Sequence, residues 1–132
     1  MCKYLFPLAA SLLVFTLGHA KEPETKVENV SAKEAKSLLD DPAKKIVVLD
    51  VRTPSEFKAG HLSKAKLIDF KAAGFDKEIA KLDKTETYLV HCRSGGRSSA
   101  AVEKMKSHGF SKIYHLDGGM LAWEKAGGKV EK

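Results

Sequence analysis

The chain has 132 residues, a length typical of one domain, and carries 23 lysines and arginines against 17 aspartates and glutamates, a net charge of +6. The lysines are spread along the sequence and form no cluster interleaved with aromatic residues, which argues against a nucleic-acid-binding protein. The 2 cysteines and 5 histidines show no metal-ligand spacing, so we expect neither a metal nor a cofactor.

The first twenty residues have the pattern of a secretory signal peptide. Lys3 supplies a positive charge, an apolar stretch runs from Leu5 to Leu17, and Gly18-His19-Ala20 ends in the small residues typical of a cleavage site. The apolar stretch is too short to favour a transmembrane helix. We therefore expect an exported and most simply periplasmic protein, with residues 1–20 removed, no stable membrane insertion afterwards, and residues 21–26 as a flexible lead-in.

The body of the chain, residues 27–128, alternates short apolar runs with segments of helical periodicity, and residues 129–132 follow as a C-terminal tail. Strands are predicted over residues 26–30, 46–51, 66–70, 87–90 and 112–116, and helices over residues 32–39, 55–59, 75–82, 98–108 and 121–126. This alternation predicts an α/β domain with a mainly parallel central sheet flanked by helices. In such sheets the ligand crevice lies at the carboxyl ends of the strands.

The stretch HCRSGGRSS, from His91 to Ser99, lies between a predicted strand and a predicted helix. Its two glycines allow the loop to curl so that backbone N–H groups point inward, and the helix adds its positive end to the same concavity. We expect Cys92 at the mouth of this concavity as a thiol of lowered pKa. The alternative is a small buried cysteine. The neighbouring Arg93 and Arg97 favour the interpretation of Cys92 as a nucleophile, because two arginines suit a bound anion better than an apolar core.

Three segments resemble motifs of the rhodanese-domain family of sulfurtransferases. Residues 50–62, DVRTPSEFKAGHL, are similar to the pattern D-x-R-x-x-x-E-[FY]-x-x-G-H-[IL]; residues 92–98, CRSGGRS, to the loop C-R-x-G-x-R-S; and residues 118–123, GGMLAW, to the closing G-G-x-x-x-W. Residues 63–66, SKAK, depart from the family, which often has Pro-Gly-Ala there. The resemblance implies a three-layer rhodanese-like fold, and the size and export pattern are similar to those of small periplasmic rhodaneses.

The resemblance also implies a double displacement. Cys92 would attack the outer sulfur of thiosulfate, become a persulfide and pass the sulfur to a thiophilic acceptor, either cyanide or a thiol, including a protein thiol. No general base is required. The residues expected to bind the donor and the persulfide are Arg93, Ser94, Gly95, Gly96, Arg97 and Ser98.

The remaining charged and histidine residues have less specific patterns. Asp50, Arg52 and Glu56 stand beside a buried strand, and we expect a structural ion pair there rather than a catalytic dyad. His91 should point away from the cysteine because side chains alternate along a strand, which disfavours papain-type catalysis. Two other histidines remain open as candidates for a place near the thiol, His61 and His115.

Two other functions are compatible with this loop. A cysteine phosphatase or arsenate reductase also places a cysteine and an arginine on a turn from strand to helix, but with the spacing C-x5-R rather than the C-x4-R of Cys92 and Arg97. The shorter loop makes a smaller cup, which suits a sulfur atom better than a phosphate group. The other alternative is a sulfur carrier or binding module without turnover of small molecules.

Overall fold

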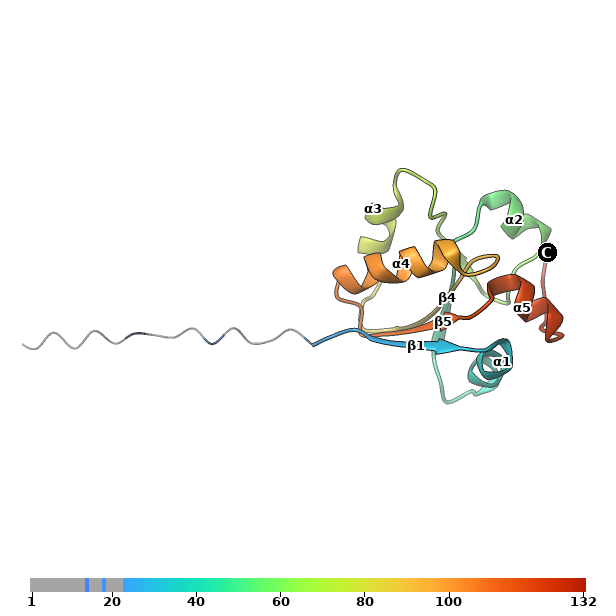
Figure 1. Ribbon diagram of the computed structural model, residues 1–132, viewed down its shortest axis with the longest axis horizontal. Helices are drawn as coiled ribbons and strands as arrows, with labels where there is room; N and C mark the ends of the chain where they lie inside the picture. The colour runs from blue at the N-terminus through green and yellow to red at the C-terminus, as the bar shows by residue number, and fades with distance from the viewer. Residues whose placement is uncertain (1–13, 15–17, 19–22) are drawn as a thin grey trace, which may run out of the picture.

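The computed structural model describes residues 14, 18 and 23–132 (Figure 1). The rest of the predicted signal peptide and the first two residues of the predicted lead-in lie outside the described residues. The elements follow one another as β1 (Lys26–Val30), α1 (Ala32–Asp40), β2 (Ile46–Asp50), α2 (Pro54–Ala59), β3 (Lys66–Leu67), α3 (Phe75–Ala80), β4 (Thr87–His91), α4 (Gly96–Ser107), β5 (Lys112–Leu116) and α5 (Gly119–Lys125). Among the described residues, no helix has the length and apolar character needed to cross a membrane.

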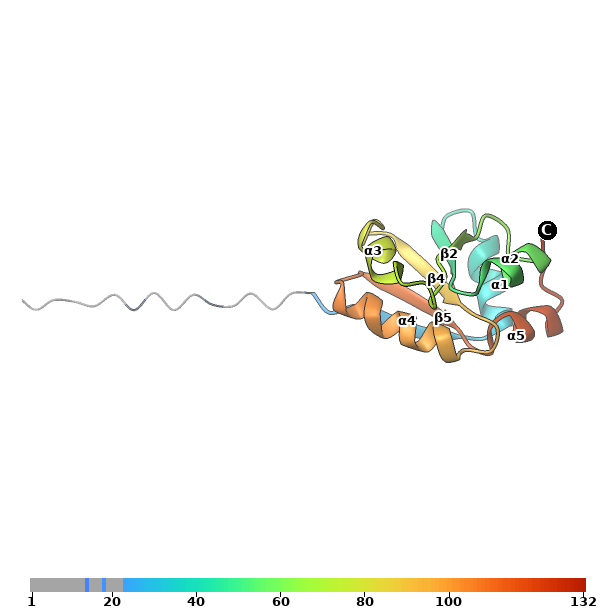
Figure 2. The same ribbon diagram turned by 90° about the horizontal axis from the view of Figure 1, so that it is seen from above.

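The strands form one sheet in the order β1-β5-β4-β2-β3, and every pair of neighbouring strands is parallel. Helices α3 and α4 cover one face of the sheet, and α1 and α5 lie on the other (Figures 1 and 2). This is the expected three-layer α/β fold, with a sheet that is fully rather than mainly parallel. Because all strands run the same way, the ends of β2, β4 and β5 meet at one edge of the sheet.

Two hydrophobic cores lie on opposite faces of the sheet. Leu49 and Val90 belong to the core beneath α3 and α4, whereas their neighbours Val48 and Leu89 belong to the core beneath α1 and α5. Successive residues of a strand point to opposite faces, so an uninterrupted apolar run fills both cores. Burial on both faces makes the sheet a rigid base for the loops at its edge.

Several predicted boundaries differ from the structure. Lys26 was expected both as the last residue of the flexible lead-in and as the first residue of a strand; its amide donates to the Ser111 carbonyl (2.9 Å), and it begins β1, as the strand prediction has it. The strand predicted over 66–70 is two residues long, because β2 ends at Asp50, the partner of Leu67. The amides of Ile68 and Phe70 still donate to the carbonyls of Asp50 (2.9 Å) and Val51 (3.1 Å). Helix α4 begins two residues earlier than predicted, because the N-cap is Gly95, whose φ of 120° glycine adopts easily.

The C-terminal tail is packed against the domain. The amide and carbonyl of Glu131 form two hydrogen bonds with those of His61 (2.8 and 2.9 Å), an isolated antiparallel bridge. The indole nitrogen of Trp123 donates to the Lys129 carbonyl (2.9 Å). The ordered structure therefore extends beyond residue 128, the expected end of the domain.

Candidate active site

The loop after β4 has its carbonyl groups turned toward α5. The amides of Met120 and Leu121 donate to the carbonyls of Cys92 (2.9 Å) and Arg93 (3.1 Å). These amides belong to the first turn of α5 and have no partner within their own helix. With the carbonyls held on that side, the amides of the loop are free to face the cysteine.

Gly119 makes the approach of α5 to the loop possible. A Cβ atom at this position would collide with the Cys92 carbonyl oxygen and lie 2.7 Å from the Arg93 carbonyl carbon. Its φ of 56° also lies in the left-handed region, which glycine adopts most easily. The third motif of the sequence therefore has a structural reason, which is the contact of α5 with the cysteine loop.

The sulfur of Cys92 lies inside the loop rather than at its mouth. The residue is 1% exposed, and Sγ accepts hydrogen bonds from the Gly95 amide (3.1 Å) and from Ser98 Oγ (3.3 Å). It also faces the first turn of α4, whose N-terminal end carries partial positive charge. The loop curls tightly enough to enclose the sulfur, which is why the expected position at the mouth is wrong.

The surroundings of the sulfur favour the thiolate. Burial acts to raise the pKa of the Cys92 thiol, but hydrogen bonds from Ser98 and from the backbone of the loop outweigh burial. The net pKa is below the usual value of a cysteine. The direction of this shift agrees with the expected thiol of lowered pKa at position 92.

Arg97 does not point into the loop as a free anion-binding group. Its Nη1 and Nη2 donate to the two carboxylate oxygens of Glu56 at 2.7 and 3.0 Å. These hydrogen bonds lower the pKa of Glu56 from 4.5 to about 2, against the opposing effect of partial burial. Glu56 also completes a capping box with Thr53 at the start of α2. The expected grouping of Glu56 with Arg52 is therefore wrong, because the fold brings Glu56 to the first turn of α4.

Asp50 and Arg52 form the buried ion pair that was expected. Arg52 binds both oxygens of Asp50, with a shortest distance of 2.7 Å, and its Nη2 also donates to the Gly60 carbonyl (2.7 Å). Asp50 is 0% and Arg52 5% exposed, so neither charge has water as an alternative partner. The pair connects the end of β2 to the segment that follows α2.

His91 is fully buried on the side of this ion pair. Its Nε2 lies 3.7 Å from an Asp50 oxygen and has no hydrogen-bond partner, while Nδ1 lies 3.1 Å from the Cys92 carbonyl oxygen. Burial lowers the pKa of His91, and the nearby Asp50 carboxylate acts in the opposite direction. The ring contacts the backbone of Cys92 and not its sulfur, as strand alternation predicts.

Of the two histidines left open, the fold brings His115 to the site. Its Nε2 lies 2.7 Å from Ser98 Oγ, and its Nδ1 lies 3.1 Å from Asn29 Oδ1. His61 instead stacks on Phe57 with 3.9 Å between the ring centroids. Sequence reasoning missed Asn29, because its place beside His115 depends on the register of β1 with β5, which no local pattern reveals.

The other loop residues differ in exposure, and Ser98 is fully buried. Arg93 and Ser94 are exposed, Gly96 is the first residue of α4, and Gly95 is its N-cap. Ser98 does not cap the helix, since its hydroxyl lies among the sulfur, the Gly95 carbonyl (3.1 Å) and His115. Ser98 therefore contacts the sulfur of Cys92 directly.

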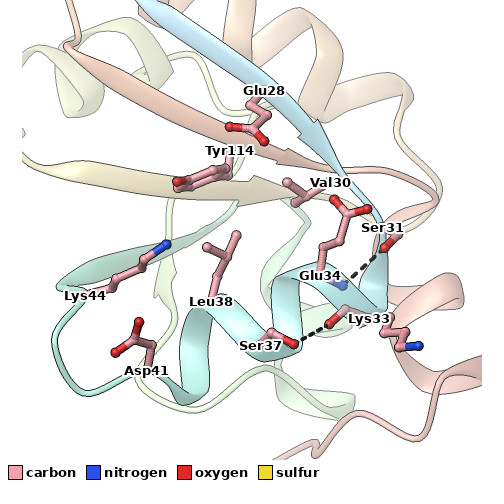
Figure 3. Close-up of a pocket in the computed structure, with 10 residues that line it drawn as sticks. All are labelled: Glu28, Val30, Ser31, Lys33, Glu34, Ser37, Leu38, Asp41, Lys44 and Tyr114. Atoms are coloured by element: carbon pink, nitrogen blue, oxygen red, sulfur yellow. Dashed lines mark hydrogen bonds between the residues drawn. The ribbon is translucent and has the colours of Figure 1, made fainter.

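A separate groove of about 820 Å³ lies between α1 and the strands β1 and β5 (Figure 3). Glu28 and Tyr114 come from the strands, and Leu38 and Lys44 come from α1 and the loop after it. The groove mixes both signs of charge and includes no residue of the cysteine loop. Within the described residues, no group of three or more histidine, cysteine, aspartate or glutamate side chains is arranged to hold a metal ion.

Residues 31–126 match the family model of the rhodanese-like domain. The chain is 30% identical over 99 residues to the thiosulfate sulfurtransferase GlpE of Ectopseudomonas mendocina, covering 75% of this chain and 86% of that protein. The crystal structure of a rhodanese-related protein from Thermoplasma volcanium is similar with a TM-score of 0.70 and 27% identity, covering 79% of this chain and 97% of that chain.

Some relatives are much longer. The chain is 34% identical over 100 residues to a probable adenylyltransferase/sulfurtransferase, MoeZ, of Mycobacterium tuberculosis, covering 76% of this chain. The chain spans 25% of the length of that protein. The similarity to MoeZ therefore concerns one part of a larger protein.

Proposed function

This chain belongs to the rhodanese-like domain family, and we propose that it is a sulfurtransferase that takes sulfane sulfur from thiosulfate onto Cys92 and passes it to a thiophilic acceptor. One observation carries the proposal. Cys92 Sγ accepts hydrogen bonds from the Gly95 amide and from Ser98 Oγ, within a loop whose carbonyls are bonded to α5. Such an arrangement stabilises an anion on sulfur, whether thiolate or persulfide.

The first half-reaction is a displacement at sulfur. The thiolate of Cys92 donates its electron pair to the outer sulfur of thiosulfate and forms a new S–S bond. The S–S bond of thiosulfate breaks, and its electron pair leaves on sulfite. The negative charge of the resulting persulfide then lies within the same set of donors, and the first turn of α4 adds its positive end.

The second half-reaction returns the enzyme to its starting state. A nucleophilic acceptor, cyanide or a thiolate, attacks the terminal sulfur of the persulfide, and the S–S bond to Cys92 breaks with its electron pair left on Sγ. With cyanide the product is thiocyanate, and with a thiol it is a new persulfide. A protein thiol is a proposed acceptor of the same class, and the sulfur-carrier alternative differs in using that acceptor alone.

The phosphatase alternative is weaker because of Arg97. A phosphatase of this kind needs an arginine at the end of the loop to bind the phosphate oxygens. Both terminal nitrogens of Arg97 already bind the carboxylate of Glu56. A dianionic phosphate would also meet that carboxylate close to the loop, which opposes its binding.

The test is the intact mass of the full chain before and after thiosulfate, with Cys2→Ser as the background so that Cys92 is the one thiol. If the proposed function is right, the mass increases by one sulfur atom, cyanide removes that atom, and the mass of a Cys92→Ser variant does not change. Hydrolysis of an aryl phosphate without sulfur gain would indicate the phosphatase. Sulfur loading that a protein thiol removes and cyanide does not would indicate the carrier.

We also propose export to the periplasm, on the pattern of residues 1–20 alone. The check is N-terminal sequencing of the protein recovered from a periplasmic fraction, where cleavage after about Ala20 is the expected result. Recovery of the uncleaved chain from the cytoplasm would contradict export.

A further inference from the structure

A chain of hydrogen-bonding groups runs from Cys92 to the edge strand of the sheet. Ser98 Oγ lies 3.3 Å from Cys92 Sγ and 2.7 Å from His115 Nε2. On the far side of the ring, His115 Nδ1 lies 3.1 Å from Asn29 Oδ1. The displacement chemistry proposed for Cys92 uses Ser98 but requires neither His115 nor Asn29.

The parallel sheet explains why these residues meet. Register pairs His115 with Asn29 on one side and with Val90 on the other, so the three side chains point to the same face. Cys92 follows Val90 by two residues, which places it on that face as well. Helix α4 covers this face above β4 and β5 (Figure 1), and its first turn brings Ser98 between the sulfur and the imidazole.

The donors and acceptors define the direction of each hydrogen bond from Asn29 to Cys92. Asn29 Oδ1 can only accept, so Nδ1 of His115 carries the ring hydrogen in the neutral form. Nε2 then has a lone pair and accepts the hydrogen of the Ser98 hydroxyl at 2.7 Å, the shortest contact of that oxygen. The Gly95 carbonyl, at 3.1 Å, is the longer alternative acceptor. In this protonated state of the thiol, Ser98 Oγ keeps a lone pair for the hydrogen of the Cys92 thiol, whereas the donation from Ser98 Oγ to Sγ at 3.3 Å belongs to the thiolate.

We propose that His115 is a positioning residue that ionises Cys92 through Ser98 and then holds the Ser98 hydroxyl toward the sulfur. In the proton-transfer step the S–H bond breaks, and its electron pair stays on Sγ. That proton moves to Ser98 Oγ while the original hydroxyl proton of Ser98 moves to His115 Nε2. No atom is oxidised or reduced, and the product is a thiolate and imidazolium pair joined by the hydroxyl.

The protonated state of His115 suits the thiolate. An imidazolium donates from both nitrogens, to Asn29 Oδ1 and to Ser98 Oγ, so the Ser98 hydrogen has the sulfur as its acceptor. When His115 is neutral, the same hydrogen is shared with Nε2 and the sulfur loses part of its stabilisation. The charge on His115 and the charge on Cys92 therefore favour each other.

Few charges face His115 besides the thiol itself. β1 contributes the neutral Asn29, α4 the neutral Ser98 and β4 the apolar Val90, while Asp117, just after β5, is the charged neighbour. Burial lowers the pKa of His115, and Asp117 opposes this effect. The imidazole is therefore neutral near pH 7 before the thiol ionises, as a proton acceptor must be.

The inference rests on the proposed function only in taking Cys92 as the reacting thiol, and the experiment measures the ionisation of that thiol directly. The rate of alkylation by iodoacetamide is followed against pH in the full chain carrying Cys2→Ser, alone and with His115→Gln, Ser98→Ala or both. Each single variant is expected to raise the midpoint by about one pH unit, because an opposite charge nearby is worth that much or more. The double variant is expected to shift no further than either single variant, since both break one chain.

His108→Gln is the matched control, because His108 lies at the other end of α4, 3.7 Å from Asp76, and is expected to leave the midpoint unchanged. A second readout is the pKa of the His115 imidazole, measured by nuclear magnetic resonance. This pKa is expected to be lower in Cys92→Ala than in the parent with its thiol ionised, because the variant has no thiolate to stabilise the imidazolium. This reciprocal shift would not arise from a merely structural histidine.

Coincident midpoints for His115→Gln and His108→Gln, or additive shifts in the double variant, would overturn the proposal. If His115→Gln does not fold by circular dichroism, Asn29→Asp replaces it. Its carboxylate stabilises the imidazolium, so the midpoint is expected to fall, and an unchanged midpoint overturns the proposal. If the alkylation profile shifts but Cys92 gains no sulfur from thiosulfate, the proposed function is wrong and the role of His115 stands. If Cys92 gains sulfur and the profile does not shift, the proposed function stands and the role of His115 is wrong.

Discussion

Arg93 and Arg97 flank the same loop but have different partners. Arg97 is 21% exposed on its side chain and is bound through both terminal nitrogens to Glu56. Arg93 is exposed, and in the described part of the chain it forms no ion pair. A charge already matched by a carboxylate attracts a second anion weakly, so we expect Arg93 to contribute more than Arg97 to the attraction of an anionic donor.

Arg93→Ala is therefore expected to raise the KM for thiosulfate roughly tenfold, the value of a charge-assisted hydrogen bond, with little change in Tm. Arg97→Ala is expected to lower Tm by several degrees and to change KM less, because it breaks the connection between α2 and α4. Steady-state kinetics and thermal melts of both variants make the comparison. A larger KM effect for Arg97→Ala would show that Arg97 leaves Glu56 to bind the donor.

The Glu56–Arg97 pair also predicts a pH dependence of stability. The pKa of Glu56 is lowered from 4.5 to about 2 in the folded state, so the unfolded chain binds more protons between these values. The stabilisation is fully present above about pH 4.5 and is lost as the pH falls toward about 2. After allowance for solvent screening, we expect on the order of 1–2 kcal/mol in the free energy of unfolding.

The measurement is urea unfolding of the parent and of Glu56→Gln from pH 7 to pH 2. The difference between the two free energies of unfolding is expected to shrink across the acid range and to vanish near pH 2. Glu78→Gln serves as the control, because Glu78 pairs with Lys81 on the surface, where such a pair contributes little. A constant difference for Glu56→Gln at all pH values would contradict the linkage.

At the scale of elements, the contact of α5 with the cysteine loop is decisive for the site. The first turn of α5 holds two loop carbonyls, and the first turn of α4 faces the sulfur. Two helix starts therefore meet the loop from different sides, one binding its carbonyls and one facing the reactive atom. Neither the sheet nor α4 alone would keep the loop amides turned inward.

Gly119→Ala tests this contact. The added Cβ would collide with the Cys92 carbonyl and must move α5 away from the loop. We expect a loss of more than about 2 kcal/mol in the free energy of unfolding together with loss of sulfur loading at Cys92. Gly109→Ala is the matched control, with φ of 79° and open space around the position, and should cost about 1 kcal/mol without affecting loading. Normal loading in Gly119→Ala would show that the loop keeps its shape without α5.

At the scale of the whole molecule, the end of the chain closes the domain beside the site. Glu131 forms its bridge with His61, the residue directly after Gly60, whose carbonyl accepts a hydrogen bond from Arg52. Val130 fills the space next to Gly60, where a Cβ would meet its side chain. The C-terminal tail therefore contributes to the same region as the first rhodanese motif.

Removal of residues 129–132 is expected to destabilise the protein. Three hydrogen bonds are lost, two with His61 and one with Trp123, at about 1 kcal/mol each, which corresponds to a fall in Tm of roughly 10 °C. Removal of Lys132 alone is the control and should leave Tm unchanged. Equal Tm values for the chain with and without residues 129–132 would show that the tail contributes no stability.

Local patterns in the sequence were sufficient for much of the fold. The run from Ile46 to Val51 predicts a strand buried on both faces, because such burial requires continuous apolar residues, and residues 112–116 predict a further strand. The cysteine loop was also visible, since its glycines, arginines and serines are consecutive and the helix that follows is contiguous with it. A site built from one short segment leaves its signal in that segment.

Contacts between distant segments were decided by the tertiary structure. Arg97 meets Glu56 across 41 positions and His115 meets Asn29 across 86, and neither pairing has a local signature. Strand order and register decide which side chains share a face, and they depend on how the crossover helices pack. The sequence by itself therefore determined the family and the position of the proposed nucleophile, whereas the partner of each arginine and histidine was decided only when the parallel strands brought their ends together.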